Sequence, residues 1–218
     1  MIIGIDGACK WGGTPECVSC GVAVINDDEN IYYKSTVESE STSQRGELNG
    51  LLMALEEACK HEDTSDDVII ITDSEYIYNA ITKEWCQKWK ANNWIGSTGS
   101  RVKNVDKWER IVELVAKLEG RLFMQWTKGH LISNLSDSVV KRIVDKDPTG
   151  ISLIDNISTL ANRASECERV AADFNDHRVR QGQHAVPLEV AIEWTVMNVA
   201  ADLLAGYIKN TVIAAGKI

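Results

Sequence analysis

The chain opens with short runs of apolar or alternating residues that indicate β-strands. Three such runs cover residues 2–9, 21–26 and 31–38, and the polar stretch 26–28 separates the last two. An alternation with a period of two is typical of strands that bury one face, and closely spaced runs joined by turn residues form hairpins. The sequence therefore predicts a three-stranded meander at the start of the chain.

Helical segments and further strands alternate in the next part of the chain. The continuous β-branched run at 68–72 predicts a buried parallel strand, and residues 121–127 predict a last strand. Helical spacing of apolar residues or helical composition marks four segments, at 44–60, 74–81, 85–91 and 105–118. A meander followed by strands that alternate with helices predicts a mixed sheet covered by helices.

After residue 130 the strand signal disappears. Apolar residues from Ile154 to Phe174 recur every three or four positions, which predicts one long amphipathic helix. Pro187 is placed to open a final helix that extends to Asn210. The last third of the chain is therefore expected to be all-helical.

Length and composition indicate an ordinary folded protein. The 218 residues, of which 44% are hydrophobic, suffice for one compact domain or for a domain with a sizeable insertion. The first residues contain no basic region, and no segment is long and uncharged enough to span a bilayer. We expect a cytoplasmic protein without membrane contacts.

The six cysteines are spread through the chain, which in the absence of targeting signals indicates reduced thiols, most of them in the core. Cys17 and Cys20 form a CxxC motif, which can supply half of a zinc site. The sequence has no second CxxC and no HxxxH pair to complete four ligands. A metal role for these cysteines is therefore the weaker interpretation.

The charge distribution bears on nucleic-acid binding. The net charge of −9 argues against a protein that coats nucleic acid through its overall charge. Locally the picture differs, because residues 83–110 contain seven basic and three acidic residues. That stretch can follow a phosphate backbone.

Four carboxylates are candidates for chemistry, although three of them also have ordinary interpretations. Asp6 ends an apolar strand before Gly7 and can be a turn residue, Glu47 can interact with a helix dipole, and Asp73 can be a helix N-cap. Asp202 is the only charged residue between Glu193 and Lys209, in a helix that is apolar on nearly all sides. A buried carboxylate is costly unless a cation or hydrogen-bond donors meet it.

Several segments around these acids resemble type 1 ribonuclease H of the bacterial and phage kind. The segments are IDGAC (5–9), QRGELNGLLMALEEA (44–58), ITDSEYIYNAI (71–81), WTKGH (126–130) and MNVAADLLA (197–205). WCQKWKANNW and VKNVDKWERI resemble the aromatic and basic handle of that family. The resemblance covers nearly all of residues 1–130 and the last helix.

The resemblance implies a ribonuclease H-like α/β fold, with a five-stranded mixed sheet flanked by helices. It implies an endonuclease that hydrolyses the RNA strand of RNA/DNA hybrids with two Mg²⁺ ions, for which Mn²⁺ can substitute, leaving 3′-hydroxyl and 5′-phosphate ends. The metal ligands are then Asp6, Glu47, Asp73 and Asp202, with Asp6 bridging both ions. His130 matches the histidine that assists proton handling and product departure.

The resemblance also implies contacts with the hybrid. Cys9, Gln44 and Glu75 match positions near the RNA strand, and Thr42 matches one near a DNA phosphate. In the handle, tryptophans can stack on sugars or pack the helix, and lysines can bind phosphates or remain solvated surface charge. The residues concerned are Trp85, Trp89, Trp94, Lys88, Lys90 and Lys103.

One departure from the family is a helical insertion. In the family the histidine and the last aspartate lie close in sequence, whereas here residues 131–195 separate them, so that 1–130 and 196–218 form the ribonuclease H-like domain. The insertion can cover the site, form a homodimer interface or contact a replication protein, but plain stabilisation is slightly favoured. Its ten acidic and seven basic residues do not suggest a hybrid-binding module.

The departure leaves a rival for the fourth ligand, because Asp137 follows His130 closely. Asp202 is preferred, since AADLLA matches the family helix and a buried lone charge needs a reason. The turn WGGTPECVSCG also replaces a shorter loop.

Two other functions stay open: a nuclease for structured RNA or branched DNA, and a non-catalytic adaptor on the same fold. Four retained acids argue against the adaptor.

Overall fold

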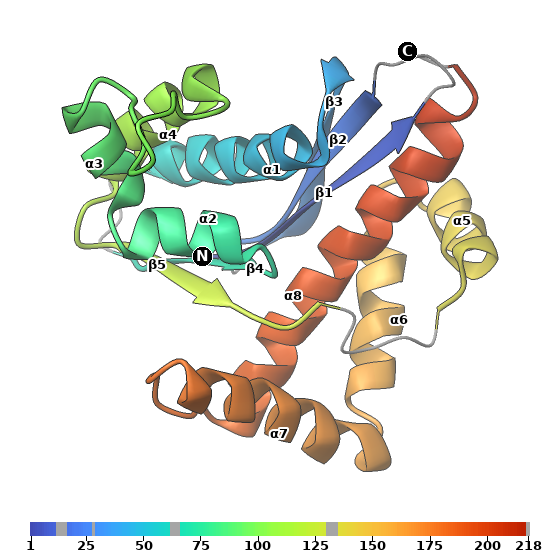
Figure 1. Cartoon of the computed structure of the whole chain (residues 1–218). Coiled ribbons are helices and arrows are strands. Elements are labelled where there is room, and N and C mark those ends of the chain that lie inside the picture. Colours follow the sequence, from blue (N-terminus) through green and yellow to red (C-terminus); the bar gives the residue numbers. More distant parts are fainter. Residues whose placement is uncertain (12–16, 28, 62–65, 130–134, 217–218) are drawn as a thin grey trace.

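The computed structural model describes residues 1–11, 17–27, 29–61, 66–129 and 135–216. Its centre is one five-stranded sheet with the order β3-β2-β1-β4-β5 (Figure 1). β1 pairs antiparallel with β2 and parallel with β4, and β5 is a parallel edge strand. The strands are β1 (Ile2–Trp11), β2 (Cys17–Asn26), β3 (Ile31–Ser41), β4 (Val68–Thr72) and β5 (Leu122–Trp126). The predicted mixed sheet is therefore confirmed.

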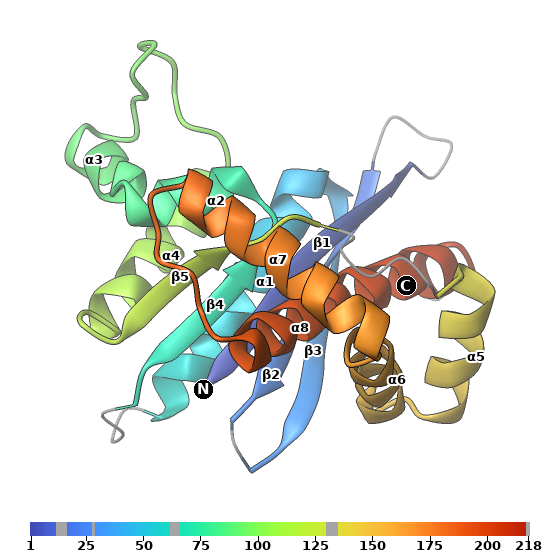
Figure 2. The same ribbon diagram turned by 90° about the horizontal axis from the view of Figure 1, so that it is seen from below.

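Helices cover both faces of this sheet. One face packs against α1 (Ser43–Ala58), α2 (Glu75–Thr82), α3 (Trp85–Ala91) and α4 (Val105–Lys117). The other face packs against α8 (Leu188–Tyr207), and around α8 lie α5 (Asp137–Lys146), α6 (Ile151–Ala161) and α7 (Ala164–Arg180). Figures 1 and 2 show α1 and α8 on opposite sides of β1. A 3-10 turn (Cys59–His61) follows α1, and a π-helical turn (Ile208–Ile213) follows α8.

The alternation of side chains along β1 explains the two layers. Ile3 and Ile5 are fully buried on the face covered by α1. Gly4 faces α8, and Asp6, two residues along the strand, shares that face. The strand at the centre of the sheet therefore carries both a core face and a carboxylate that points towards α8.

Gly4 allows α8 to lie directly on the sheet. A Cβ atom at this position would come within 2.2 Å of the backbone oxygen of Met197. Backbone atoms on both sides leave little room for adjustment. The close approach of α8 to β1 thus depends on a residue without a side chain.

We expect Gly4→Ala to destabilise the protein by roughly 1–3 kcal/mol, because an overpacked interface must shift its backbone. Gly206→Ala, within α8, is the matched control, since nothing lies within 4 Å of its added Cβ. The control should keep or slightly raise stability, because alanine favours a helix over glycine by about 1 kcal/mol. Urea unfolding measures both, and equal midpoints for the two variants would contradict the expectation.

The long helix expected over residues 154–174 is wrong. The structure has two helices there, because Arg163 takes an extended conformation (φ −64°, ψ 136°) and Asn162 bonds back to the Ser158 carbonyl (2.9 Å). The preceding α5 was not predicted. Apolar residues of α6 and of the first part of α7 pack on the same core, which is why the periodicity continues across the break.

The final helix agrees with the prediction, with Pro187 as its N-cap residue. Most of its side chains from Ala191 to Ala205 are buried. Among the described parts of the chain, no helix is long and apolar enough to cross a membrane.

Candidate functional site

Asp6 lies at the centre of the sheet, where helices from both faces come close. On the α1 side, a Cβ at Gly7 would come within 2.2 Å of the Glu47 backbone nitrogen. On the α8 side, Asp6 shares its face with Gly4, which contacts the backbone of Met197. The two glycines therefore bring α1 and α8 to the same stretch of β1, one from each side of Asp6.

Glu47 projects from the second turn of α1. The N-cap of this helix is Thr42, whose side chain accepts a hydrogen bond from the Arg45 nitrogen (3.3 Å), and the first turn contains no acidic residue. The alternative interpretation, in which Glu47 interacts with the helix dipole from the first turn, is therefore wrong. Burial, and then the neighbouring Asp73 carboxylate, raise the pKa of Glu47 above its ordinary value.

Ser74, which the sequence analysis did not single out, connects Glu47 to α2. Its hydroxyl donates to Glu47 Oε2 (2.6 Å) and accepts from the Ile77 nitrogen (3.5 Å) as the N-cap of α2. The N-cap is therefore Ser74, and the alternative role of Asp73 as a cap is wrong. The signal was present, because a serine directly before a helical segment is a typical cap.

Asp73 lies just beyond the end of β4, beside the end of β5. The indole nitrogen of Trp126 donates to the Asp73 backbone oxygen (2.9 Å). A Cβ at Gly129 would come within 2.4 Å of Asp73 Oδ2. The segment after β5 therefore packs directly on Asp73. His130 lies outside the described residues.

The four candidate acids act on one another electrostatically. The pKa of Asp6 is raised well above its ordinary value of 3.8, first by burial and then by Asp73, Asp202 and Glu47. Asp6 is itself only partly exposed to solvent. Within the described ranges, no three His, Cys, Asp or Glu side chains lie close enough to hold one ion as they stand. Like charges repel, so a cation would have to draw these carboxylates together.

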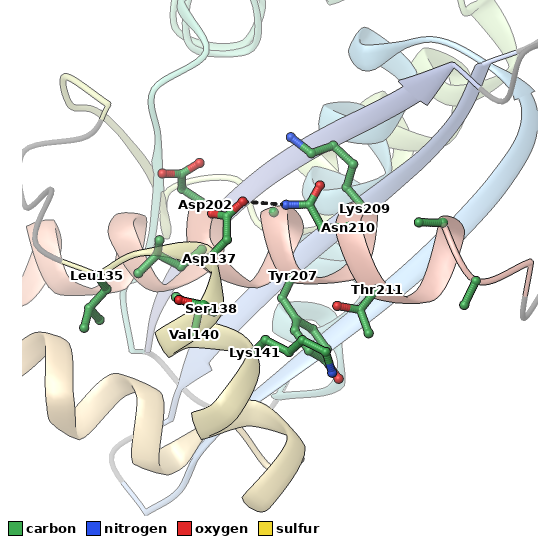
Figure 3. Close-up of a pocket in the computed structure, with 14 residues that line it drawn as sticks. Leu135, Asp137, Ser138, Val140, Lys141, Asp202, Tyr207, Lys209, Asn210 and Thr211 are labelled. Atoms are coloured by element: carbon green, nitrogen blue, oxygen red, sulfur yellow. Dashed lines mark hydrogen bonds between the residues drawn. The ribbon is translucent and has the colours of Figure 1, made fainter.

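Asp137 is the rival for the fourth acid of this group. It is an exposed residue of α5, and it accepts a hydrogen bond from Asn210 Nδ2 (2.8 Å). Asp137 and Asp202 line the same cleft of about 920 Å³ between α5 and the end of α8 (Figure 3). Asp202, and not Asp137, is among the groups that raise the pKa of Asp6.

Gly129→Ala should displace the Asp73 carboxylate without unfolding the protein, since Gly129 does not have a positive φ. A misplacement of about 1 Å can cost roughly 10²-fold in rate, so we expect a loss of that order with little change in melting temperature. Gly96→Ala is the control, because its Cβ would make only ordinary contacts at 3.5 Å or more. Equal rates for the two variants would contradict the expectation.

The predicted nucleic-acid contacts lie on several elements. Thr42 caps α1, while Gln44 and Glu75 are exposed at the starts of α1 and α2. The predicted lysines of the handle are exposed too, and Lys88 also donates to the Lys83 backbone oxygen (2.9 Å). These lysines are Lys88, Lys90 and Lys103.

The handle tryptophans pack against the core. Trp94 is 9% exposed and belongs to the core, so packing and not stacking on a sugar describes this residue. Trp89 is partly buried, with ring centroids 5.4 Å from Trp108 and 6.3 Å from Tyr76. Trp85 lies beside it at 6.3 Å. Trp94 is therefore a core residue, whereas Trp85 and Trp89 are partly buried against that core.

The expectation of reduced cysteines throughout is wrong at one place. Cys9 and Cys17 are joined by a disulfide across β1 and β2, with their Cα atoms 6.3 Å apart. The other half of the CxxC motif, Cys20, is buried, and its thiol donates to the Ala205 backbone oxygen (3.5 Å). Burial raises the pKa of Cys20 to about 11. Pairing across adjacent strands was not visible from the spacing, and it separates Cys17 from any zinc role with Cys20.

Comparisons with known proteins agree with this architecture. The family model for RNase H matches residues 1–143, which is more than half of the chain. The chain belongs to the RNase H family. Ribonuclease H of Caldicellulosiruptor saccharolyticus is 31% identical over 150 residues, covering 66% of this chain and 95% of that protein. Ribonuclease HI of Synechocystis sp. is 32% identical over 125 residues, covering 57% of this chain and 73% of that protein.

The fold is also similar to that of a solved structure described as the foamy viral protease-reverse transcriptase in complex with RNA/DNA hybrid. The TM-score is 0.51 and the identity 18%, over 58% of this chain and 17% of that chain. The family match makes this chain an enzyme of the ribonuclease H type. The matched residues include Asp137 and end before Asp202.

Proposed function

We propose that this protein is an endonuclease that hydrolyses the RNA strand of RNA/DNA hybrids. The observation that carries the proposal is the group of four acids around Asp6, formed where β1, α1, α8 and the end of β4 meet in an RNase H fold. The relatives named above are ribonucleases H. Residues 131–195 are then an insertion into that fold, which follows β5 and ends within the first turns of α8.

The side chains fit a divalent metal. The donors in this group are all carboxylates, and hard cations such as Mg²⁺ prefer oxygen ligands. Burial and mutual repulsion raise the pKa of both Asp6 and Glu47, so a cation would relieve an unfavourable arrangement. We propose Asp6, Glu47, Asp73 and Asp202 as ligands of two Mg²⁺ ions, with Mn²⁺ as a substitute.

Metal bound at this site would activate a water molecule and stabilise charge on the scissile phosphate, leaving 3′-hydroxyl and 5′-phosphate ends. The protein's own residues fix the geometry. Ser74 holds the Glu47 carboxylate (2.6 Å), and Trp126 holds the backbone at Asp73 (2.9 Å). Because their neighbours constrain them, both acids are positioned before substrate arrives.

The pKa shifts predict how stability responds to pH and metal. Above a pH of about 4, Asp6 and Glu47 lose their protons in the unfolded chain, whereas the native state still holds them because their folded pKa values are raised. The native state then binds more protons, so the free energy of unfolding falls as the pH passes through the folded values. Mg²⁺ should reverse this, because its ligands must be deprotonated.

Melting temperatures between pH 4 and pH 8, with Mg²⁺ or with a chelator, measure the effect. Asp6→Asn is the reference, because other acids of this protein have lowered pKa values that produce the opposite trend. Without metal, wild type should lose stability relative to Asp6→Asn as the pH rises. A constant difference between the two across this range would count against the buried acidic cluster.

Cleavage of end-labelled substrates tests the proposed function itself. With Mg²⁺, we expect cuts in the RNA strand of a hybrid and much slower cutting of single-stranded RNA and duplex DNA. Faster cutting of structured RNA or branched DNA would identify a different nuclease. A folded wild type that cuts none of these substrates would overturn the proposal in favour of an adaptor.

A further inference from the structure

The C-terminal end of α7 lies against the part of the sheet that carries Asp73. The ring centroids of His177 and Trp126 are 3.6 Å apart. Trp126 in turn donates its indole N–H to the Asp73 backbone oxygen (2.9 Å). One ring contact therefore connects α7 to the backbone of a candidate metal ligand, and Figure 2 shows α7 running from α6 to a C-terminal end beside α2.

Polar contacts fix this end of α7 in place. Gln183 donates to the Tyr78 hydroxyl of α2 (2.6 Å), and Arg178 donates to the side-chain oxygen of Gln125, a buried residue of β5. The Arg178 guanidinium also lies 5.4 Å from the Trp194 ring. Arg178 therefore makes contacts within the protein. We call this anchored C-terminal end of α7 and the residues just after it, 177–183, the platform.

Two exposed basic side chains, Lys128 and Arg180, act electrostatically on His177 at this platform. Burial lowers the pKa of His177, and the nearby Arg180 and Lys128 lower it further, whereas Glu75 raises it. His177 is then neutral at pH 7 and acts by packing. The Arg180 side chain is 77% exposed, and its ion pair with Asp176 at 4.0 Å joins two exposed groups and contributes little. Lys128 is exposed beside Gly129, which contacts Asp73.

We propose that Lys128 and Arg180 form a phosphate-binding pair, through which α7 holds the nucleic-acid backbone beside Asp73. Lys128 is next to the residue that touches Asp73, and Arg180 lies one helical turn beyond His177. The net acidity of residues 131–195 had argued against such a role, but charge on one exposed surface decides phosphate binding. The inference rests on the proposed function for the identity of the substrate.

Binding of a fluorescent RNA/DNA hybrid tests the pair. The full chain carries Asp73→Asn so that the hybrid stays intact, and the dissociation constant is measured by anisotropy at several salt concentrations with Mg²⁺. Arg180→Gln and Lys128→Gln are compared with Arg163→Gln, an exposed arginine at the opposite end of α7. Arg180→Lys retains the charge.

Each lost phosphate contact should lower the slope of log affinity against log salt by about 0.9. When the salt is raised from about 50 to 200 mM, the affinity of a variant that lacks one contact should therefore fall about 3.5-fold less than the affinity of the protein that keeps it. We expect this for Arg180→Gln and Lys128→Gln, no change for Arg163→Gln, and recovery for Arg180→Lys. Slopes for Arg180→Gln and Lys128→Gln equal to that of Arg163→Gln would overturn the inference, as would failure of Arg180→Lys to recover.

Failure of the proposed function gives a different result. If wild type does not cleave the hybrid, the proposed function fails whatever the slopes are. If wild type cleaves it and the slopes do not change, only the phosphate-binding pair fails. A raised KM with unchanged kcat for Arg180→Gln in the active enzyme supports the pair, because loss of uniform substrate binding has that signature.

Discussion

Asp73→Asn should abolish most of the hydrolysis of RNA in a hybrid while the protein stays folded. Asparagine keeps the size of the side chain but removes the charge that would bind a cation. Metal-ion catalysis contributes several kcal/mol of transition-state stabilisation, and each 1.36 kcal/mol corresponds to a tenfold rate change, so we expect a loss of roughly 10³-fold. Initial rates on an end-labelled hybrid with Mg²⁺ measure it.

The same substitution should not destabilise the fold. Asp73 raises the pKa of both Asp6 and Glu47, so removing its charge relieves repulsion in the metal-free protein. Its backbone oxygen, which accepts from Trp126, is unaffected. The control is Asp67→Asn, at an exposed position just before β4 begins, and it should keep full activity. An Asp73→Asn protein that retained a tenth of the wild-type rate would exclude Asp73 as an essential ligand.

Local patterns were sufficient to predict most of the central fold. The β-branched run of β4 and the apolar runs of β1 to β3 are strand signals that require no knowledge of distant residues. The break between α6 and α7 could not be found this way. Apolar residues on both sides of Arg163 pack on one core, so the periodicity continues where the backbone does not.

The four acids of the site were predicted from the sequence, whereas its long-range contacts were not. Asp6, Glu47, Asp73 and Asp202 were identified from their motifs, and the structure brings them close enough to influence the pKa of Asp6. The contact between Trp126 and His177 could not be predicted, because it joins residues far apart in the sequence. The Cys9–Cys17 disulfide was missed for a related reason, since it depends on how two strands align.

Asp202→Asn and Asp137→Asn should differ sharply in activity, which decides the fourth acid of the site. We expect roughly 10²- to 10³-fold loss for Asp202→Asn, by the same loss of metal-bound charge. Asp137→Asn should cleave within about twofold of wild type and change stability by no more than about 0.5 kcal/mol, as exposed substitutions usually do. Asp137 is exposed and bonded to Asn210, whereas Asp202 raises the pKa of Asp6.

The opposite result has a clear structural meaning, because both acids line one cleft and the family match covers only Asp137. An inactive Asp137→Asn with an active Asp202→Asn would mean that α5 supplies the fourth ligand and must move towards Asp6. Full activity in both would mean that three acids suffice. Loss of activity only in Asp202→Asn would mean that α8 supplies the fourth acid. This helix packs on β1 at Gly4, although α5, α6 and α7 separate it from β5 along the chain.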